Sequence, residues 1–435
     1  MKLTSFFKGL SLLIILNVLV KPVWIFFIDR QVQNRIGNEE YGNYFALLNL
    51  SIVLIFIADA GLSTMLNQRL ALTAKENLGN LFRIKFFFIT LYILVGLLIG
   101  YFIHARVDIL LYILFIQALT SLFVFIRNII TSHQYFAVDA FLSVIDKFLM
   151  IIFCGLLIYT TFFRNISLII FLQLQLGATA FSVAVALLFV VYNGLFTKGE
   201  KESIRQIFFA IVPFAIIILL MSTHYRLDGF LLKQMHANGA EQAGIYASAY
   251  RLLDASNMLG YLAASFLLPF AARNRNDLFL INRSVNWIST GLLITAYLII
   301  SFTISFAPWL IKILYHSDNH YQSLVLQLCL LSLPGYYIVH IYGSILTALS
   351  QFRKFISILL ISVLINSLLN IILIPAYGAA GCCIAAISSQ CFCGISCLIA
   401  SLKELKTKFN YRQHFILLVS FFLLCILFFL IKEII

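Results

Sequence analysis

The sequence predicts an all-α polytopic membrane protein that crosses the bilayer about thirteen times. Of its 435 residues, 62% are hydrophobic and only 11% are charged, whereas about a quarter of the residues of soluble proteins carry a charge. Apolar stretches recur along the chain between short polar breaks, and about 20 such residues span a hydrocarbon layer roughly 30 Å thick. They are too long and too continuously apolar for barrel strands, which have about 10 residues of alternating character.

The expected spans follow one another with short connections. They cover residues 10–28, 41–62, 84–104, 109–130, 141–163, 168–192, 207–226, 243–268, 285–306, 324–349, 355–374, 378–401 and 415–432. Lys2 and Lys8 precede the first apolar run, as they would in a secretion signal, but Lys21-Pro22 follows it where a small-residue cleavage site would stand. We therefore interpret this run as the first membrane helix.

The basic residues predict the orientation of the chain. Of the 30 Lys and Arg residues, 19 lie near the amino terminus and the even-numbered connections. Eight lie on the opposite side, namely Arg30, Arg35, Arg106, Arg164, Arg226, Lys233, Lys312 and Lys432. Short loops rich in Lys and Arg stay in the cytoplasm. The amino terminus is therefore expected inside, and the odd number of helices puts the carboxyl terminus outside.

An internal repeat predicts two lobes. Segments 39–46 and 241–248 share Glu, Gly and Tyr at an offset of 202 residues, and each joins the first helix of a group to the second. We expect an N-terminal six-helix lobe over 1–202, a C-terminal six-helix lobe over 203–402, and a basic loop with one extra helix over 403–435. The charged segment 193–206 would link the lobes. Six is even, so the lobes form a parallel repeat, and transporters of this kind bind substrate between the lobes near the midplane.

Charged residues within the expected spans are the candidate site, because a charge deep in a bilayer costs several kcal/mol. Lys21, Arg226 and Arg251 belong to the first helices of the two lobes, and we expect them to line the cleft and bind an anionic substrate head. Asp59, Asp228 and Asp254 are candidates for supporting these cations or for ion coupling. The competing structural explanations are a self-contained Arg251–Asp254 pair, Arg226 at the outer surface and Asp59 as a helix cap or the partner of a loop Arg. We expect Lys147 to extend to the cytoplasmic face.

Several function classes lack the residues that they require. The eight cysteines all fall inside expected spans without His or carboxylate neighbours, so we expect no metal site and interpret them as packing residues. No phosphate-binding Gly-rich loop is present, which argues against ATP-driven transport. The net charge of +13 is scattered over many loops, so no nucleic-acid partner is expected. We expect no cofactor and no catalytic residues, and hence no enzyme.

Three stretches resemble the lipid-linked oligosaccharide flippases (the Wzx or polysaccharide-biosynthesis family) of the MOP exporter superfamily. The first is Asp59-Ala60-Gly61-Leu62-Ser63, near Arg69. The second is Arg226-Leu227-Asp228 followed by segment 244–252, and the third is segment 374–381, preceded by Asn366 and Asn370. Their order and helix placement agree with the family over most of residues 1–402. The extra helix at 415–432 departs from it, because twelve spans are usual.

The resemblance implies a MATE-like fold of two six-helix lobes that open alternately to either side. It implies that the protein flips an undecaprenyl-pyrophosphate-linked glycan, such as an O-antigen, lipopolysaccharide or capsule repeat unit, across the bacterial plasma (inner) membrane to its outer leaflet. Lys21, Arg226 and Arg251 are the positions that match the family's use of cationic cavity residues. The remaining expected partners are membrane lipid, a coupling proton or sodium ion, and a polysaccharide polymerase.

Three alternatives stay open on the sequence. A MATE-like multidrug exporter would expel organic cations with Na⁺ or H⁺, and the cationic bias of the candidate residues argues against it. A lipid II flippase has extra helices, as this chain does. A membrane glycan polymerase or ligase would act outside, but the external connections 227–242 and 307–323 are short and carry no paired carboxylates.

Overall fold

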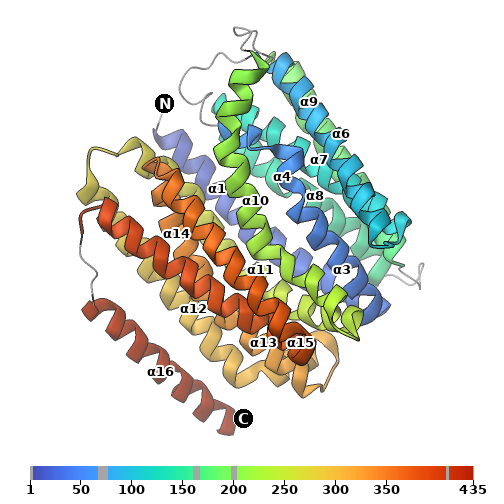
Figure 1. Cartoon of the computed structure of the whole chain (residues 1–435), viewed down its shortest axis with the longest axis vertical. Helices are drawn as coiled ribbons and strands as arrows, with labels where there is room; N and C mark the ends of the chain where they lie inside the picture. Colours follow the sequence, from blue (N-terminus) through green and yellow to red (C-terminus); the bar gives the residue numbers. More distant parts are fainter. Residues whose placement is uncertain (1–2, 67–76, 160–166, 197–202, 408–410, 435) are drawn as a thin grey trace. The chain divides into compact units, whose positions relative to one another are not determined.

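The computed structural model describes residues 3–66, 77–159, 167–196, 203–407 and 411–434. Arg69 of the resemblance and residues 197–202 of the expected linker lie outside this part of the chain. The described residues form helices joined by short connections and divide into two compact units, Met1–Phe230 and Leu231–Ile435. Figure 1 shows the helices of each unit. The lobe boundaries at residues 202 and 402, which the sequence repeat predicts, stay a prediction.

The first unit is built from ten helices in the described part of its chain. They are α1 (Leu3–Val23), the π-helix η1 (Trp24–Asp29), α2 (Arg30–Ile36), α3 (Asn38–Val53), α4 (Ile55–Asp59), α6 (Leu78–Phe102), α7 (Val107–Ser132), α8 (Phe136–Tyr159), α9 (Leu168–Tyr192) and α10 (Ile204–Met235), the last of which continues into the second unit. Helix α1 packs along α8, and α7 packs along α9.

The second unit begins near the end of α10. Its helices are α11 (Gly239–Arg273), α12 (Leu278–Tyr315), α13 (His320–Leu331), α14 (Leu333–Ala348), α15 (Phe352–Glu404) and α16 (Tyr411–Ile434). Helix α14 packs against α11 and α15, and α16 packs against α12. The Cys425 Sγ on α16 lies 3.4 Å from the Ser301 Oγ on α12. The thirteenth expected span, 415–432, therefore lies in a helix that packs on its own unit.

The predicted membrane-spanning architecture is confirmed. Eleven helical stretches of the described chain are long and apolar enough to cross a membrane, and Val419–Lys432 in α16 is a shorter apolar helix. One of the eleven, α15, has a non-helical backbone at Gly378, so it contributes two of the expected spans. Its two arms have roughly 26 residues each, or about 39 Å at 1.5 Å per residue, which exceeds the roughly 30 Å hydrocarbon layer.

The change of direction in α15 depends on side chains of neighbouring helices. At Gly378 the backbone has φ 54° and ψ −129°, which residues with a Cβ rarely adopt. The second arm begins there with backbone N–H groups that lack helical acceptors. The Gln242 Oε1 accepts from the Ala379 N–H at 2.9 Å, and the Tyr321 hydroxyl oxygen accepts from the Ala380 N–H at 3.2 Å. Helices α11 and α13 therefore cap the second arm of α15.

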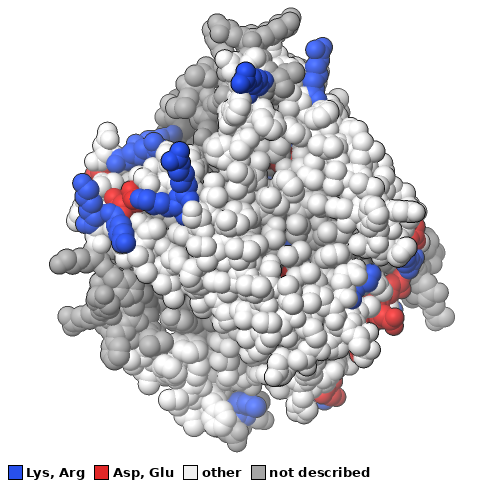
Figure 2. Space-filling view, in the orientation of Figure 1, with Lys and Arg blue, Asp and Glu red and all other residues white. Residues whose placement is uncertain are grey.

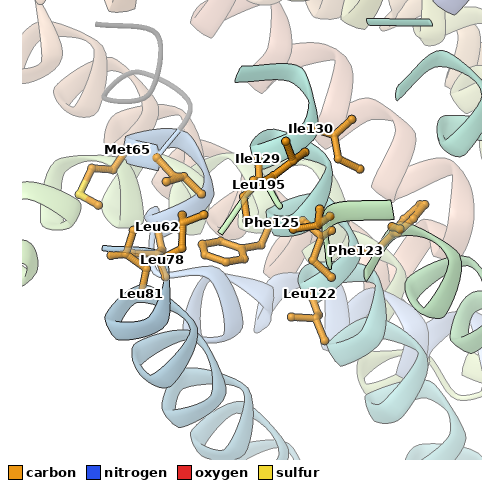
Figure 3. Packing of buried hydrophobic residues seen from close by; sticks show 14 of the residues in the cluster. Leu62, Met65, Leu78, Leu81, Leu122, Phe123, Phe125, Ile129, Ile130 and Leu195 are labelled. Atoms are coloured by element: carbon orange, nitrogen blue, oxygen red, sulfur yellow. The ribbon is translucent and has the colours of Figure 1, made fainter. Parts of the chain in front are cut away.

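A hydrophobic cluster holds one end of the first unit together. Figure 3 shows Leu62 and Met65 facing Leu78 and Leu81 of α6, with Phe125 of α7 beside them. The same cluster includes Ile207 and Ile211 of α10, which places the start of that helix in the first unit. The chain turns at Gly61, directly before Leu62. There φ is +77°, and a Cβ would lie 2.6 Å from the Phe214 Cβ of α10. Glycine at this position therefore permits both the turn and the close approach of α10.

Candidate functional site

The first candidate cation, Lys21, stands where α1 changes its helical geometry. Pro22 follows it inside the helix and has no backbone N–H to donate. The π-helix η1 begins two residues later, and the Arg30 N–H donates to the Ile25 O, five residues back. Wide turns of this kind occur frequently at functional sites. Lys21 is half-buried, and the adjacent Trp24 is buried.

Helix α8 presents polar and charged groups to this part of α1. The Asn17 amide, one turn before Lys21, donates to the Ser143 Oγ of α8 at 2.8 Å. One turn further along α8, the Lys147 ammonium lies 4.6 Å from the centroid of the Trp24 ring. Its side chain is 22% exposed. Lys147 was expected to extend to the cytoplasmic face. In the structure its ammonium makes a cation–π contact with the Trp24 ring of η1.

Helix α7 contributes a further cation, Arg127, near Lys21 and Lys147. The charges of Lys147, Asp146 and Arg127 all act on the Lys21 ammonium. The Arg127 Nε donates to the Asp139 Oδ1 of α8 at 2.6 Å, and the Lys147 Nζ lies 3.1 Å from the Asp146 Oδ2.

Both carboxylates of this group are thus engaged by other cations. Within the described part of the chain, Lys21 itself makes no ion pair. We call Lys21, Arg127 and Lys147, with Asp139 and Asp146, the Lys21 cluster. Three cations and two carboxylates leave it with a net charge of +1.

Asp59 belongs to a separate ion pair. The Lys85 ammonium on α6 lies 2.8 Å from the Asp59 Oδ1 and donates to the Ser121 Oγ of α7 at 2.8 Å. Ser63 also donates to the Asp59 carboxylate. Lys85 is fully buried, although it is one of the 19 Lys and Arg residues expected near the amino terminus and the even-numbered connections. The partner of Asp59 is therefore a buried helix Lys and not a loop Arg.

Arg226 and Asp228 lie on α10, in the part that packs against α3. Asp228 is buried and Arg226 half-buried. A Cβ on the neighbouring Gly229 would lie 2.6 Å from the Asn49 Nδ2 of α3, so the two backbones approach closely here. The Ser222 hydroxyl, one turn before Arg226, lies 3.3 Å from the Val53 O. Both charges thus sit on the α10 segment that is fixed against α3.

Arg251 and Asp254 lie one turn apart on α11, in the second unit. Arg251 is 8% exposed, and Asn257 continues the buried polar side of the helix. Helix α14 covers this side: the Tyr337 hydroxyl donates to the Ser256 O at 2.7 Å, and the rings of His340 and Tyr261 are 4.2 Å apart. His340 is also buried at this helix contact. The polar side of α11 is thus packed against another helix of its unit.

The solved structures that resemble this chain share its fold over nearly its whole length. One is titled lipid II flippase MurJ in an inward closed conformation, with a TM-score of 0.68, 16% identity, and 97% of this chain and 98% of that chain covered. A Vibrio cholerae MATE transporter, VcmN, in the bent form has a TM-score of 0.62, 16% identity, and 93% and 98% covered. An inward-facing multidrug resistance MATE family transporter of the MOP superfamily has a TM-score of 0.64, 14% identity, and 88% and 94% covered.

The chain has a MurJ- and MATE-like fold. It is therefore a multi-pass membrane protein with the architecture that the sequence predicts. No family model matches the sequence, and no curated protein matches it. The similarity thus rests on the course of the helices and not on sequence identity.

Most of the Lys21 cluster was not predicted from the sequence. Lys21 was a candidate residue, but Arg127 and the contact between Lys147 and Trp24 were not expected. A usable signal was present, because Asn17, Lys21 and Trp24 recur at the three- or four-residue spacing of one helix face. The partner helix α8 could not be identified from spacing alone, because it lies more than 100 residues away along the chain.

Proposed function

We propose that this protein is an alternating-access flippase for an undecaprenyl-pyrophosphate-linked oligosaccharide, and that the Lys21 cluster binds the anionic head of this substrate. Arg226 of α10 and Arg251 of α11 are the further cations that we assign to this binding. The protein would move the glycan from the cytoplasmic to the outer leaflet of a bacterial plasma membrane, with its amino terminus in the cytoplasm. Translocation forms and breaks no covalent bond, so the proposal needs neither a catalytic residue nor a cofactor.

The observation that carries this proposal is the cationic character of the Lys21 cluster. Asp139 and Asp146 are each engaged by another cation of the cluster, while Lys21 makes no ion pair in the described part of the chain. An ammonium in this position favours an anion, because a charge away from water needs a counter-charge. A pyrophosphate supplies several acceptor oxygens and negative charges for such groups.

The lipid part of the substrate explains why a membrane-embedded site is required. A polyprenyl chain is apolar, so its transfer from the bilayer into water is unfavourable. The chain can stay among the acyl chains while only the pyrophosphate and sugars enter the protein. Fixed cations can replace the water that the pyrophosphate loses.

Two transporter classes with this fold are the alternatives. The similarity to a structure titled lipid II flippase favours a second lipid-linked glycan, which would use the same cations for its pyrophosphate. The similarity to MATE transporters favours export of a drug-like compound, often an organic cation. An organic cation requires carboxylates that are not already paired with Lys or Arg, and in the Lys21 cluster both are paired.

Translocation in proteoliposomes tests the proposal. The labelled substrates would be an undecaprenyl-pyrophosphate oligosaccharide and lipid II, each followed across the bilayer for the wild type and for Lys21→Ala, Arg226→Ala and Arg251→Ala. Wild-type transport of the oligosaccharide, with at least a tenfold lower rate in Lys21→Ala, is expected. Lys312→Ala is the matched control, because Lys312 is 68% exposed and forms a surface pair with Asp318.

The result also separates the alternatives. Transport of lipid II with no transport of the oligosaccharide would place this chain with the lipid II flippases. Inactivity on both lipids, together with gradient-driven efflux of an organic cation, would reject a flippase function. Size-exclusion profiles of the variants distinguish a lost binding group from a lost fold.

A further inference from the structure

A groove between the two arms of α15 has no role in the proposed transport site. It has a volume of about 540 Å³ and lies where the first arm begins and the second arm ends. Gly378 reverses the chain, so residues about 50 positions apart come together here. The groove is lined by Arg353, Lys354, Ser357, Ile358, Ser396, Ile399, Ala400, Lys403 and Glu404.

The rim of this groove is strongly basic. Arg353, Lys354 and Lys403 contribute three positive charges, and Glu404 contributes one negative charge, which leaves a net charge of +2. Glu404 forms an ion pair with Lys354 across the two arms. In Figure 2, a group of Lys and Arg side chains surrounds an acidic side chain over this end of the second unit. The ion pair neutralises Lys354, whereas Arg353 and Lys403 are exposed to a ligand.

The groove also has an apolar wall. Ile358, Ile399 and Ala400 line it about one helical turn farther from the ends of α15 than Arg353, Lys354, Lys403 and Glu404 do. The neighbouring Leu360, Ile361 and Ile395, each 47–52% exposed, continue as the hydrophobic outer surface of the same two arms. A ligand here meets cations at one end and hydrocarbon at the other. A phospholipid has the same two parts in the same order. Its phosphate lies at the membrane surface, and its acyl chains extend into the bilayer.

We propose that this groove binds the phosphate headgroup of an anionic phospholipid. Arg353 and Lys403 bind the phosphate oxygens, while Glu404 neutralises Lys354. The acyl chains follow the apolar wall formed by Ile358 and Ile399. Basic pockets between membrane helices are suited to anionic headgroups, and each Lys or Arg near the surface contributes about 1 kcal/mol. The apolar wall favours a lipid over a free phosphate, because a free phosphate has no hydrocarbon part that could contact the wall.

Native mass spectrometry of the full-length, detergent-solubilised protein tests the proposal. The protein is titrated with phosphatidylglycerol, with phosphatidylcholine as the neutral reference and glycerol phosphate as the soluble headgroup. Arg353→Gln/Lys403→Gln is expected to bind phosphatidylglycerol roughly 30-fold more weakly, which is the loss of two contacts of about 1 kcal/mol each. The control, Arg106→Gln/Lys312→Gln, removes two exposed cations that form other surface pairs and should bind as the wild type does.

A second variant changes the affinity in the opposite direction, so that misfolding cannot imitate the result. Glu404→Gln raises the net charge of the rim to +3 and should tighten phosphatidylglycerol binding about 5-fold. Equal affinities of the groove variant and its control would overturn the proposal. Glycerol phosphate binding as tightly as the lipid would overturn it too, because the site would then recognise a free phosphate ester.

Discussion

Individual charged residues differ in what surrounds them, although the sequence presents all of them as charges within apolar helices. Lys85 and Asp59 form a buried pair, and Arg127 and Asp139 form another between α7 and α8. Lys21 lies beside such a pair without forming one in the described chain. A paired charge mainly maintains structure, because its counter-charge is already in place. A cation without an ion pair can instead bind an anionic ligand.

Replacing Lys85 by Met should destabilise the protein strongly. The substitution leaves the Asp59 carboxylate without its counter-charge in a site where the Lys85 side chain is fully buried. Breaking a buried pair from one side costs about 3–5 kcal/mol of the free energy of unfolding. The measurement is the unfolding transition of the purified protein in detergent. The double variant Lys85→Met/Asp59→Asn should recover most of the loss, because it removes both charges.

A surface ion pair provides the comparison for this prediction. Lys312→Met breaks the pair with Asp318, whose side chains are 68% and 78% exposed. Such pairs contribute about 0–1 kcal/mol, so the unfolding transition should hardly move. If Lys85→Met and Lys312→Met shift the transition equally, the Lys85–Asp59 pair has no special structural role.

Among the elements, α15 shows how a local backbone choice controls the arrangement of a unit. Its two arms run in opposite directions because Gly378 takes a backbone conformation outside the helical region. Gln242 of α11 and Tyr321 of α13 then accept the hydrogen bonds of the new helix start. The Tyr321 hydroxyl also lies 2.8 Å from the Tyr377 O. One reversal of direction thus depends on three helices and also creates the basic groove at the far end of α15.

Gly378→Ala should therefore destabilise the second unit. Its Cβ would lie 2.3 Å from the Gln242 Oε1, and the φ of +54° is unfavourable for alanine. Backbone strain together with a displaced hydrogen bond costs roughly 2–4 kcal/mol. The matched control is Gly291→Ala in α12, where a Cβ would meet nothing within 4 Å. That substitution should be neutral or stabilising by up to about 1 kcal/mol, because alanine is the better helix former. Equal unfolding transitions of the two variants would contradict the capping role of Gln242 and Tyr321.

For the molecule as a whole, the charges of the connections predict the orientation in the membrane. The excess of Lys and Arg near the amino terminus and the even-numbered connections predicts that these connections lie in the cytoplasm. By the same prediction the Arg353–Lys403 groove would lie on that side, where anionic lipids would face the basic residues.

Reporter fusions test this orientation. A fluorescent protein fused after Phe196 should fluoresce, because it would stay in the cytoplasm. Alkaline phosphatase fused after Met235 should be active, because it would lie outside. The reverse pattern would invert the topology, and the direction of the proposed transport would be inverted with it. A third fusion, after Lys432, reports whether α16 crosses the membrane, and phosphatase activity there is expected.

The sequence by itself determined the number, the type and the approximate ends of the helices. Hydrophobic length is a property of consecutive residues, so about 20 apolar residues indicate a spanning helix wherever they pack. The motifs in the sequence also indicated a MATE-like fold. Lys21 was a candidate residue because a charge stands out against an apolar background.

The tertiary structure alone decided which charges are paired. Asp59 and Lys85 are 26 residues apart, and Lys21 and Lys147 are 126 residues apart, so no local pattern connects them. Long-range pairing depends on how helices pack, and packing depends on side-chain shape rather than on hydropathy. The same reason explains the groove between the arms of α15, whose walls become neighbours only after the chain turns back at Gly378.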